Sequence, residues 1–344
     1  MAPRQRLAPW LGLALFACAA APPSPGSAPS GSSGAPPSAE PELEPAPAHA
    51  ADEGEPIADE YPVPSAEPPT PDVPAPSVVV PSDAGVAAAR AKAESGKLAE
   101  AAAELSRVMA RVDREAPLED RVLAHALVGR RHAEKKDVKK ARVEYQQVLA
   151  AWSDPEKAVK TIMGAAPDEA QALRRLGQAL TAVGEALFFE AEQKRATALA
   201  LRPPPFSGTA SDEGIRDHLA QRVRPWMQKR RVLEGEASAA FRKILELQPA
   251  PPPRWVVAAA SEVASMQEAL PKDLEKLAIP PSLRRDPALR SAYQDALRDA
   301  MKPELERAKA AYRSCKSLAV KFRHQDAHSK ACEDRLTALE RQSP

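Results

Sequence analysis

Beyond residue 82, apolar side chains recur three and four residues apart along most of the chain, which is the spacing of one face of an α-helix. The clearest stretch runs from Pro167 to about Leu201. Its apolar positions follow 3-4-3-4 spacing and are Leu173, Leu176, Leu180, Val183 and Leu187. Such a seam predicts a long helix that packs lengthwise against a partner helix.

A second long stripe follows the run Pro203-Pro204-Pro205, which should end the first helix. Arg230 interrupts this stripe, and Pro225 should kink or divide the helix. We expect the two long helices to pair as an antiparallel hairpin. The apolar members of the second stripe are Ile215, Leu219, Val223, Trp226, Leu233, Ala237, Phe241 and Ile244.

The last quarter of the chain predicts three further helices. One covers Trp255 to Leu270, and a final pair covers about 287–319 and 326–341. Pro303 stands inside the first helix of that pair, so we expect a bend there.

Between residues 83 and 155 the pattern is that of two shorter helical hairpins. In the clearer one, Gly129 and Ala141 are small residues where two helices would cross, and Tyr145 stands beside them. This pattern resembles the tetratricopeptide repeat, a helical hairpin of about 34 residues. The matching residues of the other copy are Ala89, Ala101 and Leu105, with Gly96 in the turn. The chain thus predicts an all-α fold, in which tetratricopeptide-like hairpins form an α-solenoid with long helices.

The N-terminal residues have the layout of a bacterial signal peptide. Arg4 and Arg6 precede an apolar stretch, residues 7–17, that is too short to span a bilayer. The stretch ends in Leu15-Phe16-Ala17-Cys18, which resembles a lipobox.

We therefore predict lipidation of Cys18 after removal of residues 1–17. Several acyl chains on one residue give lasting membrane attachment, whereas one chain binds only marginally. Ordinary cleavage at the small residues around Cys18 is the alternative. Ala19 follows the cysteine, with no Asp to retain the protein at the inner membrane, so the usual sorting rule implies the outer membrane.

Residues 18–82 predict a disordered tether. Of the 37 prolines, 18 lie between Pro22 and Pro81, and Ser, Gly and acidic runs fill the rest. Such a stretch buries too little apolar surface to offset chain entropy. We expect a passive spacer, with Val78-Val79-Val80 as a possible adhesive segment. The predicted divisions are signal peptide 1–17, lipidated cysteine and tether 18–82, repeats 83–155, long hairpin 156–250 and C-terminal hairpins 251–344.

The net charge of +1 hides a strong asymmetry. Residues 19–82 hold ten acidic residues and no basic one. Without these ten and the two arginines of the signal region, 46 basic and 37 acidic residues remain, a net charge of +9 on the helical part. Solvated helix faces could account for this excess, and so could a patch for an anionic partner. No nucleic-acid docking motif is present, so no nucleic acid is expected.

No catalytic signature is found: G-x-S-x-G, the phosphate loop, H-E-x-x-H and the dinucleotide fingerprint are all missing from the sequence. We therefore expect no enzyme, no cofactor and no small-molecule substrate. His324, His328 and Cys332 stand four residues apart and suggest zinc, but the first lies in a predicted turn and no fourth ligand is evident. We expect no metal.

Cys315 and Cys332 remain once Cys18 carries lipid. An even pair in an exported protein suggests a disulfide, and the two lie equally far from the predicted turn of the last hairpin. Free thiols are the alternative. For partner binding we expect a basic groove on the second repeat, lined by His125, Arg130, Lys136 and Lys140.

The C-terminal region resembles tetratricopeptide lipoproteins of gliding deltaproteobacteria, whose members are associated with adventurous gliding motility. The residues that carry the resemblance are Arg254-Trp255-Val256-Val257-Ala258-Ala259, Ile279-Pro280, Asp286-Pro287, Ala292-Tyr293, Leu297, Pro303, Leu305, Arg307-Ala308, Ala311-Tyr312, Cys315, Cys332-Glu333 and Leu336. The resemblance implies an outer-membrane lipoprotein facing the periplasm, a non-enzymatic scaffold that binds other envelope proteins of a motility or transport complex. A passive link between outer membrane and cell wall, or a wall-associated accessory factor, is the alternative.

Overall fold

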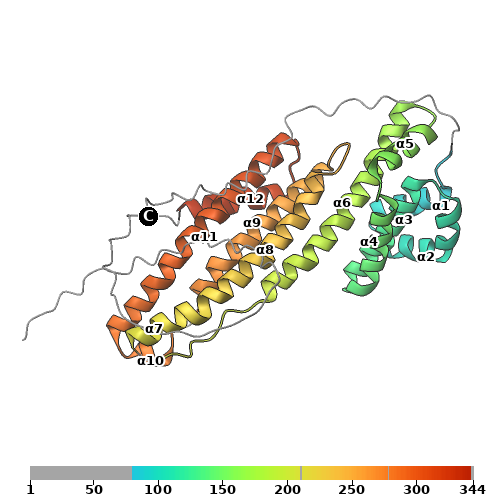
Figure 1. Ribbon diagram of the computed structural model, residues 1–344. Coiled ribbons are helices and arrows are strands. Elements are labelled where there is room, and N and C mark those ends of the chain that lie inside the picture. Colours follow the sequence, from blue (N-terminus) through green and yellow to red (C-terminus); the bar gives the residue numbers. More distant parts are fainter. Residues whose placement is uncertain (1–79, 210, 278, 342–344) are drawn as a thin grey trace, which may run out of the picture. The chain divides into compact units, whose positions relative to one another are not determined.

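The computed structural model describes residues 80–209, 211–277 and 279–341, and every regular element in these ranges is a helix (Figure 1). The predicted all-α class is therefore confirmed for this part of the chain. Residues 1–17, Cys18 and most of the predicted tether lie outside the described residues. A bilayer crossing needs a long apolar helix, and none occurs among the described elements. The elements are α1 (Ala84–Glu94), α2 (Leu98–Glu115), α3 (Leu118–Glu134), α4 (Val138–Ala151), α5 (Pro155–Ala165), α6 (Glu169–Ala200), α7 (Asp212–His218), the π-helical turn η1 (Leu219–Val223), α8 (Arg224–Leu245), α9 (Pro253–Glu275), α10 (Pro281–Arg284), α11 (Pro287–Lys321) and α12 (Ala327–Arg341).

The first four helices form two hairpins, α1–α2 and α3–α4. The Asp83 side chain accepts a hydrogen bond from the Val86 N–H and so caps α1. Each hairpin turn contains a residue with left-handed backbone, Gly96 at φ +83° in the first and Lys136 at φ +60° in the second. Glycine adopts this region freely, whereas a residue with a Cβ pays a steric cost. The second hairpin therefore holds a strained lysine at its tip.

The helices of the second hairpin meet where the sequence places its small residues. Gly129 and Ala141 are both buried, and a Cβ added to Gly129 would lie 3.3 Å from the ring of Tyr145. Larger side chains would force α3 and α4 apart at this point. In the first hairpin, the corresponding residues Ala89, Ala101 and Leu105 are likewise buried.

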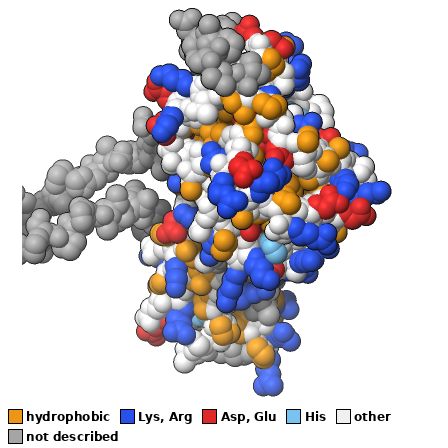
Figure 2. Space-filling model, turned by 90° about the vertical axis from the view of Figure 1, so that its right-hand side faces the viewer, with side chains coloured by type: hydrophobic (Ala, Val, Ile, Leu, Met, Phe, Trp, Pro, Cys, Tyr) orange, Lys and Arg blue, Asp and Glu red, His pale blue; other side chains and the backbone are white. Residues whose placement is uncertain are grey.

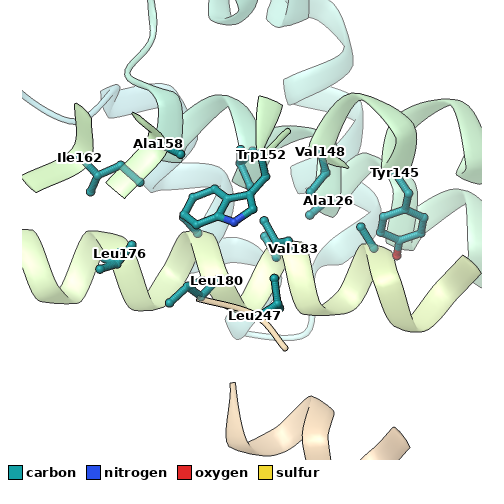
Figure 3. Close-up of a cluster of buried hydrophobic side chains, with 14 of the residues drawn as sticks. Ala126, Tyr145, Val148, Trp152, Ala158, Ile162, Leu176, Leu180, Val183 and Leu247 are labelled. Carbon is teal, nitrogen blue, oxygen red and sulfur yellow. The ribbon is translucent and has the colours of Figure 1, made fainter. Parts of the chain in front are cut away.

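The long helix α6 packs against α3, α4 and α5 and then against α8. Figure 3 shows the apolar cluster on its first half, where Ile162 lies opposite Leu176 and Trp152 lies opposite Leu180 and Val183. Leu247, which follows α8, belongs to the same cluster. The core between α3 and α6 therefore includes a residue from the second half of the chain.

The predicted seam along α6 is correct except at its first position. Leu176, Leu180 and Val183 are buried, but Leu173 is 48% exposed. The buried face begins instead with Ala172, next to Leu176. A 3.5-residue seam drifts around a straight helix of 3.6 residues per turn, so its outermost member leaves the packed face.

The predicted break at Pro225 takes the form of the π-helical turn η1, which lies between α7 and α8 just before the proline. Proline has no N–H and its ring displaces the carbonyl four residues earlier. A wider π turn accommodates that missing bond while the chain remains helical.

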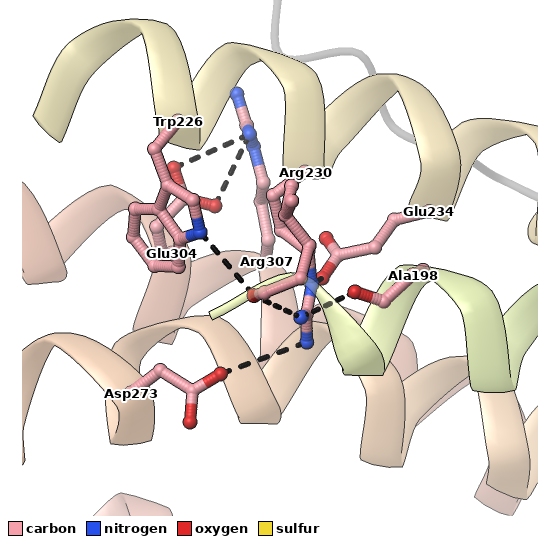
Figure 4. A network of polar contacts seen from close by, with 8 residues as sticks. Ala198, Trp226, Arg230, Glu234, Asp273, Glu304 and Arg307 are labelled. Carbon is pink, nitrogen blue, oxygen red and sulfur yellow. Dashed lines mark hydrogen bonds and ion pairs between the residues drawn. The ribbon is translucent and has the colours of Figure 1, made fainter. Parts of the chain in front are cut away.

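Arg230 does not interrupt the buried face of α8, because its side chain is itself fully buried (Figure 4). Its Nη1 donates to the carbonyls of Ala198, at 2.5 Å, and Leu201, at 3.3 Å. Its Nε donates to Glu234 at 2.6 Å, and its Nη2 lies 3.7 Å from a carboxylate oxygen of Asp273. The last carbonyls of a helix lack partners within that helix. At the end of α6, Arg230 donates hydrogen bonds to two such carbonyls.

Of the C-terminal helices, α9 is longer than its predicted range of 255–270, whereas α11 stays close to its predicted range of about 287–319. α9 continues through Pro271, and α11 continues through Pro303. α9 packs along α11, and α12 packs on both. Two carboxylates are almost fully buried at these contacts, Glu268 on α9 and Glu304 on α11.

Trp255, near the start of α9, packs closely against α6. Its Nε1 donates to the carbonyl of Thr181 at 2.9 Å. A Cβ added to Gly184 would lie 2.8 Å from Trp255 Cδ1 and 2.7 Å from Pro252 Cγ. Only glycine permits so close an approach, so this position fixes where α9 meets α6.

His218, at the end of α7, is a buried imidazole without a hydrogen-bond partner in the described part of the chain. Its ring centroid lies 4.8 Å from that of Phe206, and the side chain is 3% exposed. Burial lowers the pKa of His218, and the nearby positive charge of Arg222 lowers it further. The folded state therefore favours the neutral imidazole.

We expect His218→Phe to remove part of the acid sensitivity of the protein. Below the ordinary pKa of 6.5, His218 is protonated in the unfolded chain but stays neutral in the folded protein until the pH reaches its lower folded pKa. The free energy of unfolding therefore falls as the pH drops through this range. The variant should therefore gain stability over wild type at pH 5.5 and gain less at pH 8. Denaturant titrations of both proteins at the two pH values measure this difference. An identical gain at both would show that His218 does not titrate on unfolding.

Candidate partner-binding surface

The structure divides the four residues predicted to line a basic groove into two pairs. His125 and Arg130 bond to other helices of the same chain, whereas Lys136 and Lys140 are exposed at the α3–α4 turn. The first pair therefore supports the hairpin, and the second pair belongs to its surface.

His125 on α3 joins two neighbouring helices. Its Nδ1 lies 2.7 Å from Glu144 on α4, and its Nε2 lies 2.9 Å from Asp113 on α2. Burial alone would lower the pKa of His125, but hydrogen bonds to the two carboxylates outweigh it and raise the pKa. The imidazole thus favours its charged form and holds α2, α3 and α4 together.

Arg130, one turn further along α3, ties the second hairpin to α6. It forms a two-pronged ion pair with Glu185, in which Nε donates at 2.8 Å. The hydroxyl of Tyr145 donates to the same carboxylate at 2.9 Å. Glu185 is nearly buried, and a two-pronged arginine bond is among the strongest ways to satisfy such a carboxylate.

Beyond these bonds, the α3–α4 turn carries a dense group of basic side chains that point outward. We call this group the basic turn; its members are Arg131, Lys135, Lys136, Lys139, Lys140 and Arg142. Three of them pair with carboxylates: Arg131 with Glu134 at 3.1 Å, Lys140 with Asp137 at 3.5 Å and Arg142 with Glu190 at 3.6 Å. In the described chain, Lys135, Lys136 and Lys139 have no ion pair and are exposed.

An apolar side chain lies among these charges. Val143 is 55% exposed and stands four residues after Lys139, on the side of α4 opposite Ala141 and Tyr145. The face in Figure 2 shows basic side chains with apolar ones between them. The surface of α4 therefore combines positive charge with a small apolar contact.

Sequence reasoning missed four members of the basic turn: Arg131, Lys135, Lys139 and Arg142. A signal for Lys139 was available in the repeat pattern itself. If Ala141, Tyr145 and Val148 face the core, helical periodicity places Lys139 and Val143 outward. The unpaired state of the lysines had no such signal, because it depends on Glu134 pairing with Arg131 and Asp137 with Lys140.

The described chain begins at Val80, which is hydrogen-bonded to the folded body near the N-terminal end of α3. Val80 donates to the carbonyl of Ala165 at 2.8 Å, and its own carbonyl accepts from Arg175 at 2.8 Å. Arg175 is buried and also pairs with Glu119 at 3.1 Å. Residues from Val80 onward, predicted as the end of the tether, therefore belong to the folded body.

Asp120 and Asp83 complete this entry point. The Asp83 N–H donates to Asp120 at 2.6 Å, and Arg111 pairs with the Asp83 side chain at 2.6 Å. Burial raises the pKa of Asp120 to about 6, against the lowering effect of that N–H bond. In contrast, the hydrogen bond from Arg111 holds the pKa of Asp83 below its ordinary value.

In the last hairpin, the structure joins Cys315 on α11 to Cys332 on α12 by a disulfide, with Cα atoms 6.2 Å apart. Both cysteines are fully buried. Next to them, the Tyr312 hydroxyl donates to Glu268 at 2.8 Å, and Arg335 of α12 pairs with the same carboxylate. The sulfur of Cys332 is thus bonded to that of Cys315. No cluster of metal ligands occurs in the described ranges.

Comparisons of the chain with protein-family models, with curated proteins and with solved structures found no match.

Proposed function

We propose that this protein is a non-enzymatic periplasmic scaffold, anchored to the outer membrane by lipid on Cys18, that binds partner proteins of an envelope-spanning motility or transport complex. The observation that carries the proposal is the basic turn, a charged surface on a hairpin that internal bonds hold in place. In a fold built from helices, such a surface suits contact with another macromolecule.

The hairpins support an assignment to the tetratricopeptide class. Tyr145 packs on Gly129 at the helix crossing, and the first hairpin repeats this use of small residues. Stacked repeats of this kind form solenoids with extended binding surfaces. On this proposal, α1–α4 begin an α-solenoid, and α6 with the later helices extends it.

We further propose kinship with the tetratricopeptide lipoproteins of gliding deltaproteobacteria. Residues that carry the resemblance have evident structural roles here. Tyr312 and Cys315 lie in the core of the last hairpin, and Trp255 joins α9 to α6. A family that keeps these residues would keep this C-terminal packing.

Crosslinking of the anchored protein in cells, followed by affinity purification, tests the scaffold function. We expect a reproducible set of envelope proteins among the products. Recovery of cell-wall fragments alone, with no protein partner, would favour the alternative of a passive link between outer membrane and wall or a wall-associated accessory factor.

The lipid anchor makes a separate prediction. Cys18→Ala should leave the protein uncleaved or release it to the soluble periplasmic fraction, because the acyl chains that give lasting attachment would be lost. Membrane fractionation and the apparent mass of the product measure both outcomes. A variant that stays membrane-bound with unchanged processing contradicts lipidation.

A further inference from the structure

We infer that the basic turn binds an acidic segment of a partner protein, with Lys135, Lys136 and Lys139 as its charged contacts and Val143 as its apolar contact. The inference rests on the proposed function and specifies the chemistry of its partner. It places the contact on the turn and the outward face of α4, and does not include His125 or Arg130, which bond to other helices of the same chain.

The first support is the local excess of charge. Within residues 131–142, six basic side chains face only two acidic ones, Glu134 and Asp137. Each of these two already pairs with a basic neighbour. The charges of Lys135, Lys136 and Lys139 are therefore available, and a surface of one sign selects a partner of the opposite sign.

The second support is Val143, which identifies the kind of anion. The side chain is 55% exposed beside Lys139, and Val138 at the start of α4 is 39% exposed. A nucleic-acid backbone presents mainly phosphate charge to such a surface. A polypeptide can present carboxylates and an apolar side chain together, so the mixed surface favours an acidic protein segment.

The third support is the conformation of Lys136. The equivalent turn of the first hairpin has Gly96 in the left-handed region, with the same pattern of backbone bonds. The second turn has a lysine there, although the position is sterically suited to glycine. Strained residues persist where the surrounding structure holds them, and they often mark a functional surface.

The fourth support is the rigid attachment of α4 to the helices beneath it. The bonds of His125 to Glu144 and of Arg130 to Glu185 fix α4 against its neighbours. A surface fixed in advance loses less conformational entropy on binding.

Two arms of one experiment use the full-length protein. In cells, a photo-crosslinking amino acid is placed at Val143 or, as control, at Val320, which is 64% exposed on α11. We expect crosslinks from position 143 to a peptide of net negative charge, and their loss in the variant Lys135→Glu, Lys136→Glu, Lys139→Glu. Crosslinks that survive this variant, or that map to non-acidic peptides, overturn the inference.

In vitro, the probe is a fluorescent peptide of alternating glutamate and leucine, measured by anisotropy. The triple variant should weaken binding about tenfold. A control variant with the same charge change, Lys243→Glu, Lys276→Glu, Lys330→Glu, should bind as wild type does. Equal binding of heparin would show that charge alone is recognised, and binding only of vesicles containing phosphatidylglycerol would show a lipid site. Either result overturns the inference.

The variant Lys136→Gly separates a role of Lys136 in binding from a role in stability alone. Relief of the left-handed strain should raise Tm by about 2 °C, while loss of the charge should weaken peptide binding about threefold. Arg323, at φ +49° in the α11–α12 turn, is the matched control. Arg323→Gly should raise Tm similarly and leave peptide binding unchanged. Unchanged binding in Lys136→Gly would remove Lys136 from the site.

The two proposals can fail separately. If affinity purification yields envelope partners from both wild type and the triple variant, the scaffold function stands and the basic turn is not its binding surface. If wild type yields no protein partner, both proposals fail.

Discussion

Replacement of Arg230 by methionine is expected to lower the free energy of unfolding by about 3–5 kcal/mol, the range for removing one partner of a buried ion pair. The methionine would fill similar space, but the Ala198 and Leu201 carbonyls would lose the hydrogen bonds from Arg230. They would keep only those from the Leu201 N–H and from Trp226 Nε1. Glu234 would lose its counter-charge in a buried site. For a body of this size the change corresponds to a fall in Tm of roughly 10 °C.

The loss should depend on pH in a defined direction. Burial already raises the pKa of Glu234, although Arg230 opposes the shift. Without Arg230 the folded pKa should rise further, so the variant binds a proton on folding and regains stability at low pH. We therefore expect a smaller difference from wild type at pH 5 than at pH 8, measured by thermal unfolding at both.

Two further variants separate charge from shape. Lys229→Met changes an exposed neighbour of Arg230 and should alter stability by less than about 0.5 kcal/mol. The double variant Arg230→Met, Glu234→Leu removes both charges and should recover part of the loss, because no buried carboxylate remains unpaired. If Arg230→Met alone is as stable as wild type, the bonds of Arg230 merely offset its own desolvation.

Loss of the disulfide is expected to have the second-largest effect. Cys315→Ser should lower the free energy of unfolding by about 3 kcal/mol, the chain-entropy estimate for a closed loop of this length. The bond joins residues 17 apart across the α11–α12 turn. Because the hairpin is terminal, we expect α12 to loosen first while α1–α4 remain folded.

Hydrogen exchange of the oxidised and reduced proteins, with peptides resolved along the chain, measures this local effect. Faster exchange confined to α11 and α12 agrees with the prediction, whereas uniform acceleration would show that the last hairpin and α1–α4 unfold together. Thiol labelling of the denatured protein, isolated without exposure to reductant, is the direct test. Two readily alkylated cysteines would contradict the bond.

Most helices could be predicted because their ends depend on nearby residues. Asp83, Asp168 and Asp286 each accept hydrogen bonds from backbone N–H groups within a few residues, and such caps are readable in sequence. The sequence also predicted that Pro225 would kink or divide its helix. The π-turn form of this break could not be predicted, because the outcome depends on how the surrounding helices pack.

The polar interior could not be predicted, since its partners are distant in sequence. Arg130 and Glu185 lie 55 residues apart, and Arg230 meets the carbonyl of Ala198 from 32 residues away. From sequence alone, a charged residue on an amphipathic helix reads as exposed. The same limit applies to the candidate surface: the sequence does not place Glu185 of α6 beside Arg130, so the ion pair between them could not be predicted.

The bonds of Val80 bear on how the body would respond to mechanical force. Arg175, which holds the Val80 carbonyl, lies 95 residues further along the chain, so helices α1 to α5 fall within the loop that this contact closes. Tension applied to the chain before Val80 would first load the hydrogen bonds of Val80 to Ala165 and to Arg175 of α6. It would not first separate α1 from α2. The first hairpin would carry no load until those bonds broke.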